Sequence, residues 1–261
     1  MAHACQSKLL EVCQEVRDAI FQQAIEQDVR DSAAPTDLNT SSVQAQQSQW
    51  TLHYERTAPA PVYLNIVSTN RQLYQEIHTY MARSIHACPP AEMVLSAAYP
   101  QATAAWSRMS CPPEHIRDLI LRVKLSNLFD PALSTTTGQH DILLRPIYEV
   151  LKRFTTHGSF LAREKPLVQG LKLRTASIVI GSAIPLADMI YVYGSPQAQI
   201  DMLHDRLKPL LTRLAGSGVL AGIVDKELEL CNEGTEPVRI PVSAELWNEV
   251  EYVHFRSLGF E

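Results

Sequence analysis

The histidines and cysteines are the side chains most able to hold a metal ion or to act as nucleophiles. Histidine occurs at positions 3, 53, 78, 86, 115, 140, 157, 204 and 254. No two of them form an H-x-H or H-E-x-x-H pattern, and His78 and His86 would lie two helical turns apart, which is too far for one ion. The sequence therefore predicts neither a metal site nor a cofactor.

The five cysteines are scattered along the chain. They are Cys5, Cys13, Cys88, Cys111 and Cys231, and no pair forms a C-x-x-C motif. An odd number of cysteines without a secretory signal is typical of free thiols in a reducing compartment. Cys13 is expected on a buried helix face, and Cys111 is followed by two prolines that disfavour contact with a nearby base. We therefore expect neither to be a nucleophile.

Three glycines, Gly216, Gly218 and Gly222, resemble a phosphate-binding loop in their spacing. A phosphate loop follows a strand and opens a helix, because the helix N-terminus holds the phosphate. Here the glycines follow a predicted helix and precede a predicted strand, so we expect a helix C-terminus and a turn. Since the sequence contains no motif of a catalytic nucleophile either, it favours a protein that is not an enzyme.

Composition narrows the class of protein further. The chain has 261 residues, of which 46% are apolar and 20% charged, and its net charge is −5. This mixture is typical of a globular protein, and the acidic balance argues against nucleic-acid binding. No apolar run approaches the roughly 20 residues of a membrane span, and the first residues lack the pattern of a secretory signal. We expect an intracellular protein, of the cytoplasm or nucleus, that binds neither nucleic acid nor membrane.

Apolar periodicity divides the chain into three parts. Residues 1–28 contain an amphipathic helix, which the spacing predicts over 6–28. Residues 29–49 are rich in serine and glutamine and poor in large apolar side chains, which predicts a flexible linker or a long surface loop. Residues 50–261 are long enough to bury a core of their own and are expected to form one α/β body.

The body is expected to alternate strands and helices. Apolar alternation predicts strands over 50–54, 93–95, 119–125, 171–180, 224–231 and 238–242. Helical spacing predicts helices over 69–81, 146–157 and 196–216 and a short helix after Ser243. Pro146 is expected at the first position of its helix, and Pro209 is expected to kink or break its own. Because helical crossovers favour parallel neighbours, the predicted fold is mixed α/β (α+β). Its order is strand–helix–strand–helix–strand, followed by a C-terminal hairpin and helix.

Two segments resemble the hallmarks of fungal F-box-like proteins. Residues 10–21 (LEVCQEVRDAIF) are similar to the opening helix of that group, with Cys13 and Gln14 standing in the place of its usual proline. Residues 67–76 (VSTNRQLYQE) resemble the second hallmark of the group, an N-R-Q-L-Y-x-E pattern. The resemblance implies a protein-interaction adaptor. Such a protein docks on the adaptor subunit of a cullin–RING ubiquitin ligase and recruits a target to it.

The resemblance implies a role for particular residues in each of the two segments. Protein binding is expected of Leu9, Leu10, Cys13, Val16, Ile20 and Phe21, with the first helix laid into a groove of its partner. The alternative is that this apolar stripe packs on the core of the same chain. In the second segment Leu73 and Ile77 are expected to face the core. A structural hydrogen-bond motif is expected to include Asn70, Arg71, Gln72, Tyr74 and Glu76.

A second class of function stays open, that of a small-molecule-binding or enzymatic α/β domain. Ligand sites in open α/β sheets lie beyond the carboxyl ends of the strands. In this chain those ends fall near Ser126-Asn127, Gly181-Ser182 and Asn232-Glu233. A concave pocket with converging polar groups at that edge would favour a ligand site, and a filled surface would favour the interaction protein.

Overall fold

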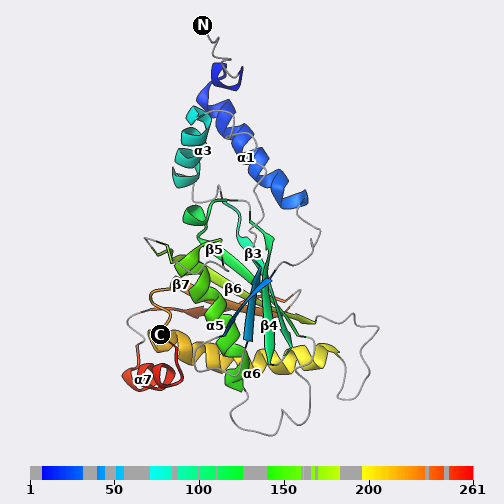
Figure 1. Cartoon of the computed structure of the whole chain (residues 1–261), viewed down its shortest axis with the longest axis vertical. Helices are drawn as coiled ribbons and strands as arrows, with labels where there is room; N and C mark the ends of the chain where they lie inside the picture. The colour runs from blue at the N-terminus through cyan, green and yellow to red at the C-terminus, as the bar shows by residue number, and fades with distance from the viewer. Residues whose placement is uncertain are drawn as a thin grey trace.

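An eight-stranded mixed sheet forms the body of the protein, and the fold is mixed α/β (Figure 1). The computed structural model describes residues 8–31, 40–44, 51–55, 71–83, 88–98, 100–109, 111–125, 140–159, 161, 166–167, 170–182, 196–232, 235–243 and 247–260. Within these ranges the α-helices are α1 (Gln14–Asp31), α3 (Arg71–Arg83), α5 (His140–His157), α6 (Pro196–Gly216) and α7 (Glu249–Ser257). Two short 3₁₀ helices are η1 (Lys8–Glu11) and η2 (Pro113–His115).

The sheet combines parallel and antiparallel neighbours. Its strands are β1 (Thr40–Gln44), β2 (Thr51–Glu55), β3 (Ala91–Ala98), β4 (Gln101–Arg108), β5 (Asp118–Leu125), β6 (Leu173–Ser182), β7 (Val224–Asn232) and β8 (Val238–Pro241). They lie in the order β1-β2-β4-β3-β5-β6-β7-β8. The β3–β5, β5–β6, β6–β7 and β2–β4 pairs are parallel, and the other three pairs are antiparallel.

The predicted order of the second half of the chain is confirmed. β5 leads through α5 to β6, and β6 leads through α6 to β7, with each new strand parallel to the one before it. A long helical crossover returns the chain to the same end of the sheet, which is why these neighbours are parallel. β8 then pairs antiparallel with β7 as the expected C-terminal hairpin partner.

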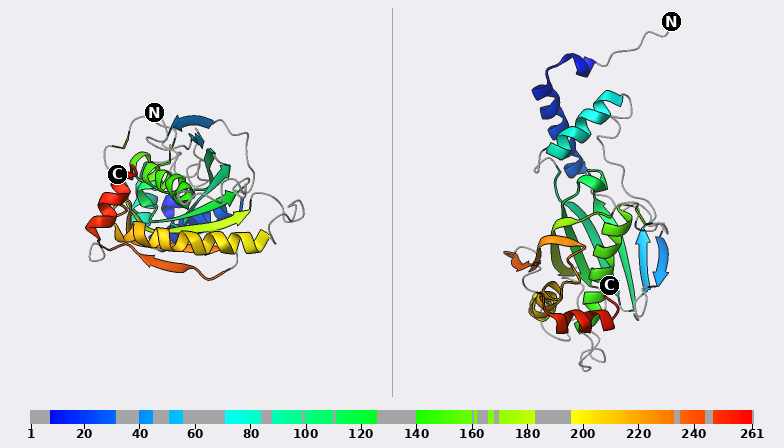
Figure 2. Two further views of the ribbon diagram at one scale, coloured as in Figure 1. Left: turned by 90° about the horizontal axis from the view of Figure 1, so that it is seen from below. Right: turned by 90° about the vertical axis from the view of Figure 1, so that its left-hand side faces the viewer.

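One face of the sheet is buried beneath the two long helices. Along β5, Leu119, Leu121 and Val123 are at most 1% exposed, whereas the alternate residues Arg122 and Lys124 are half-buried. Successive side chains of a strand point to opposite faces, so the leucines and the valine belong to the covered face. α5 and α6 contact each other, and α6 lies along β6, β7 and β8, so both helices cover the same face (Figure 2).

Each of these helices continues through a proline. α5 begins at His140, so the predicted start at Pro146 is wrong. α6 runs as one helix through Pro209, and the break considered there does not occur. A proline inside a helix costs a backbone hydrogen bond and a steric clash. Around Pro146 the complete burial of Leu144 and Ile147, each at most 1% exposed, offsets that cost.

Two strands lie where the sequence predicted none. β1 falls inside residues 29–49, so part of the expected linker pairs instead with β2 at the edge of the sheet. β4 was missed because its sequence, QATAAWSR, offers alanines in place of large apolar side chains. Ala102 and Ala104 are nevertheless buried, and Trp106 of β4 packs edge-on against Phe154 of α5, with 5.6 Å between ring centroids.

The expectation that the cysteines are free thiols is wrong for one pair. Cys88 and Cys111 form a disulfide, with their Cα atoms 5.9 Å apart. Cys88 precedes β3 and Cys111 follows β4, so the bond closes the hairpin that these strands form. A disulfide that restricts the unfolded chain is typically worth about 2–4 kcal/mol. Cys13 and Cys231 are free thiols, and Cys13 is exposed instead of buried.

α1 and α3 form a pair of helices outside the sheet, which we call the helical arm. The two helices pack on each other beyond one end of the sheet, and α7 lies near the opposite end of the molecule (Figure 1). The sequence had assigned α3 to the α/β body and α1 to a segment of its own. No helix in the described ranges has the length and apolarity needed to cross a membrane.

Packing of α6 on the sheet gives a first prediction, on stability. Leu207 of α6 is 1% exposed, so Leu207→Ala removes buried volume that the surroundings cannot fully refill. We expect a loss of about 2–5 kcal/mol in the free energy of unfolding, measured by denaturant titration. Asp205 on the same helix has an 83% exposed side chain, and Asp205→Ala should change stability by at most about 0.5 kcal/mol. Equal effects of the two substitutions would contradict the placement of α6.

Candidate functional site

α1 presents apolar side chains on two different faces. Phe21 and Ile25 are fully buried, and the Phe21 ring lies 6.4 Å from the ring of Tyr80 on α3. Val16 and Ile20, one helical turn apart, are 43% and 36% exposed. Together with Val12, which precedes the helix and is 37% exposed, we call them the exposed stripe. One face of α1 thus packs on α3, and a second apolar face stays open to solvent.

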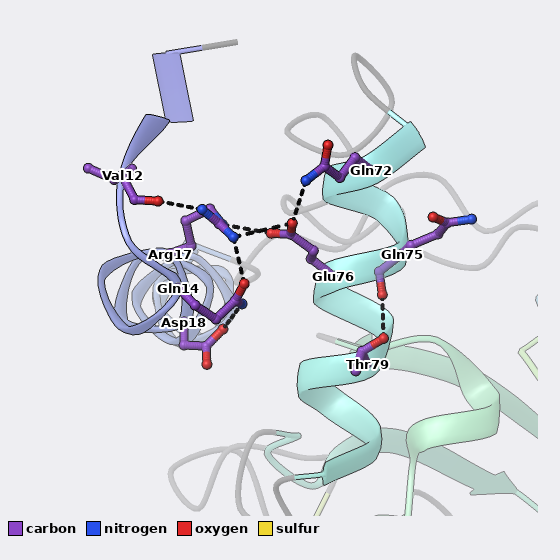
Figure 3. Close-up of polar contacts among 8 residues, drawn as sticks. All are labelled: Val12, Gln14, Arg17, Asp18, Gln72, Gln75, Glu76 and Thr79. Carbon is purple, nitrogen blue, oxygen red and sulfur yellow. Dashed lines mark hydrogen bonds and ion pairs between the residues drawn. The ribbon is translucent and has the colours of Figure 1, made fainter. Parts of the chain in front are cut away.

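An ion pair holds the two helices of the arm together (Figure 3). The Nε of Arg17 donates to Oε2 of Glu76 at 2.7 Å, and its Nη2 donates to Oε1 at 3.3 Å. The two side chains are 12% and 17% exposed, so water screens their attraction less than at an open surface. Because a planar guanidinium grips a carboxylate with two parallel bonds, the pair sets the orientation of the helices as well as their distance.

The same arginine fixes the beginning of α1. Nη1 of Arg17 donates to the carbonyl oxygen of Val12, and Nη2 donates to Oε1 of Gln14 at 2.6 Å. In the first turn the Glu15 carboxylate accepts a hydrogen bond from its own backbone N–H, and this bond, with a second from Cys13, lowers the pKa of Glu15 below its usual value. An anion at this end also suits the helix dipole. The guanidinium of Arg17 therefore connects the start of α1 to α3.

A pocket of about 580 Å³ lies between the two helices of the arm. Polar side chains from both helices line it: Gln14, Asp18, Gln72, Gln75, Glu76, Thr79, Tyr80 and Arg83. Nε2 of Gln14 donates to Asp18 at 2.7 Å, and Nε2 of Gln72 donates to Glu76 at 2.9 Å. These amides and carboxylates offer both donors and acceptors on the side of α1 that faces α3, a combination that suits a partner's peptide groups or polar side chains.

The residues predicted to bind a partner fall into different environments. Val16 and Ile20 belong to the exposed stripe, and Cys13 is exposed as well. Phe21 is buried in the arm, and Leu9 is partly buried against the core. The structure describes the backbone of Leu10 but not the position of its side chain. The single stripe that the sequence indicated is therefore divided between α3 and solvent.

The second predicted segment opens α3, and its apolar residues behave as expected. Leu73 and Ile77 are buried at 1% and 0% exposure. Glu76 accepts a hydrogen bond from the side chain of Arg17 on α1, so this residue of the expected motif joins two helices. Gln72 supports this carboxylate from one turn earlier on the same helix. The two segments on which the resemblance rests thus meet at the Arg17–Glu76 ion pair.

Arg71 and Tyr74 of this segment lie on the exposed surface of α3. Arg71 is exposed, and Asn70 falls outside the described residues. The ring of Tyr74 stacks on His78, with 4.2 Å between centroids. Nδ1 of His78 lies 3.1 Å from Nε2 of His115 in η2, a contact between the arm and the body. Burial lowers the pKa of His115, and the nearby His78 lowers it further, so this ring is neutral at pH 7.

The carboxyl ends of the strands were the alternative location for a site. Asn232 at the end of β7 is buried, and its Nδ2 donates to Oδ1 of Asp201 on α6 at 2.8 Å. Gly181 near the end of β6 is buried as well. The amide of Asn232 therefore ties a strand end to a helix. Outside the described positions lie Ser126, Asn127, Glu233 and the side chain of Ser182.

Comparison with known proteins found no relative of this chain. No protein-family model matches the chain, and neither the curated proteins nor the solved structures include one similar to it. Among the described residues the arm combines an exposed apolar stripe on α1 with a polar pocket between α1 and α3, which an ion pair joins.

The ion pair of the arm gives a second prediction. Arg17→Ala leaves the half-buried carboxylate of Glu76 without its cation, which should destabilise the arm by about 1–3 kcal/mol. Because the arm lies outside the sheet, we expect it to open locally, with backbone hydrogen exchange in α1 faster by roughly 10- to 100-fold. Exchange in β5 and β6 should stay unchanged. The matched control is Arg71→Ala, an exposed arginine of α3, which should alter exchange by about twofold at most. Equal exchange in the two variants would show that the ion pair does not hold the arm.

Proposed function

We propose that the chain is a non-enzymatic, F-box-like protein-interaction adaptor. In this proposal the helical arm docks on the adaptor subunit of a cullin–RING ubiquitin ligase, and the sheet body carries the surface for a target protein. The observation that carries the proposal is the exposed stripe of Val12, Val16 and Ile20 on an arm whose helices are already joined by an ion pair.

The chemistry of the stripe supports docking into a groove. Apolar anchors spaced by one helical turn are the pattern with which an amphipathic helix lies in a hydrophobic groove of a partner. Binding would bury the valine and isoleucine surface of the stripe, which is exposed in the free chain. Because Arg17 and Glu76 hold α1 in place before binding, little ordering entropy remains to be lost on association.

An adaptor needs a second surface, and α7 supplies one. Val250 and Val253 of α7 are 76% and 61% exposed, and Trp247, which precedes the helix, is 53% exposed. Asn248 begins this helix by accepting from the backbone N–H of Val250, so α7 begins later than predicted after Ser243. α7 lies near the end of the molecule opposite the arm (Figure 1), which leaves both surfaces accessible at once.

The proposal places the chain in the cytoplasm or nucleus, where glutathione keeps thiols reduced. There Cys88 and Cys111 would be thiols, and the hairpin of β3 and β4 would be held by its backbone pairing. The arm does not depend on this bond, because its helices are joined by the Arg17–Glu76 ion pair and by the burial of Phe21 and other apolar side chains.

Binding to the ligase adaptor subunit gives a third prediction. Val16→Glu combined with Ile20→Glu replaces two anchors by charges at exposed positions, so the fold should be retained. Each lost anchor is worth at least about 1.4 kcal/mol, and we expect affinity in a titration with the purified subunit to fall by roughly 100-fold. Val250→Glu makes the same change on α7 and serves as the matched control, with affinity unchanged.

Two results would refute the proposal. The first is absence of binding by the unaltered chain under conditions in which an ordinary F-box protein binds. The second is equal affinity of the unaltered chain and the doubly substituted variant, since docking would then not involve the exposed stripe.

A further inference from the structure

Three potential ligands for a metal ion meet where the arm joins the body. His78 comes from α3, and Glu114 and His115 come from η2. One ligand atom of each residue lies within 4.8 Å of the others, and the two facing imidazole nitrogens are 3.1 Å apart. The histidines are half-buried and the glutamate is exposed, so an ion could enter from solvent.

The spacing of the nitrogens suits a first-row transition metal. Two imidazole nitrogens bound to one tetrahedral Zn²⁺ at about 2.0–2.1 Å lie roughly 3.3–3.4 Å apart. The observed separation of 3.1 Å is close to that value, so small movements of His78 and His115 would admit the ion. Two imidazoles and one carboxylate also form a ligand set that Zn²⁺ accepts readily.

Local contacts restrict two of the three ligands, His78 and His115. Tyr74 stacks on the ring of His78, with 4.2 Å between centroids. In η2, the N–H of His115 donates to the carbonyl oxygen of Pro112 at 2.9 Å, and Pro113 restricts the backbone immediately before Glu114. Ligands carried by short, constrained elements lose little freedom when they bind, which favours metal affinity.

We propose that His78, Glu114 and His115 bind one Zn²⁺ ion that braces the helical arm against the sheet body. The ion takes three protein ligands and keeps one position for water. It bridges α3 and η2, which are far apart in the sequence, and so restrains the arm at its base. The proposal does not rest on docking to a ubiquitin ligase, because it concerns the isolated chain.

The test is a calorimetric titration of the untagged, chelator-stripped full chain with ZnCl₂, in the presence of a phosphine reductant. We expect one Zn²⁺ per chain. His78→Ala and His115→Ala should each weaken binding by about 100-fold or more, because loss even of a group that merely supports a ligand costs 10–100-fold. His254→Ala removes an exposed histidine of α7 and should leave affinity unchanged. Saturating Zn²⁺ should raise the melting temperature of the unaltered chain and not that of His78→Ala.

A second measurement keeps the proposal testable if a histidine variant fails to fold. Co²⁺ added to the unaltered chain should give the visible absorption of a tetrahedral or five-coordinate ion with nitrogen and oxygen ligands. A thiolate charge-transfer band would place the ion on cysteines and overturn the proposal. So would absence of Zn²⁺ binding at millimolar concentration, or equal affinity of the unaltered chain and both histidine variants.

Discussion

The ion pair between Arg17 and Glu76 is the constraint on which the arrangement of the arm depends. It joins residues 59 positions apart in the sequence and holds α1 against α3 with two nearly parallel hydrogen bonds. Because the same guanidinium also binds the carbonyl of Val12, it sets where α1 begins and how the chain approaches it. With α1 fixed in this orientation, Phe21 faces α3 and the stripe of Val16 and Ile20 faces solvent.

The sheet body has a different source of stability. Its strands bury one continuous apolar face under α5 and α6, so its free energy of folding comes mainly from hydrophobic burial. The arm buries far fewer residues, and that burial acts together with one partly buried ion pair and the bond from Tyr80 to Gln22, which places the arm among the parts of a protein that open most easily. This division is compatible with an adaptor whose docking element sits apart from a rigid body, and with a metal ion that braces the base of the arm.

Particular residues show how far the sequence predicted the fold. The alternating leucines of β5 and the helical spacing of α6 carry a strong periodic signal, so the parallel strands and their crossovers were predicted correctly. β1 and β4 consist mainly of serine, threonine, alanine and glutamine. Each has one large apolar side chain, Val43 or Trp106, so neither shows a clear apolar period, and both were missed. For the candidate site, the residues of α1 were identified, but their division between two faces depends on contact with α3. His78 and His115 meet through the tertiary fold, and no local spacing indicates that contact.

The central claim is that the exposed stripe of α1 is the docking surface. The most direct measurement is hydrogen–deuterium exchange of the full chain, read by mass spectrometry with and without the purified adaptor subunit of a cullin–RING ligase. The account predicts slower exchange in α1 and in the facing turns of α3, with exchange in β5, β6 and α7 unchanged. Protection of α7 or of the sheet with no change in α1 would contradict it, and so would identical exchange throughout the chain.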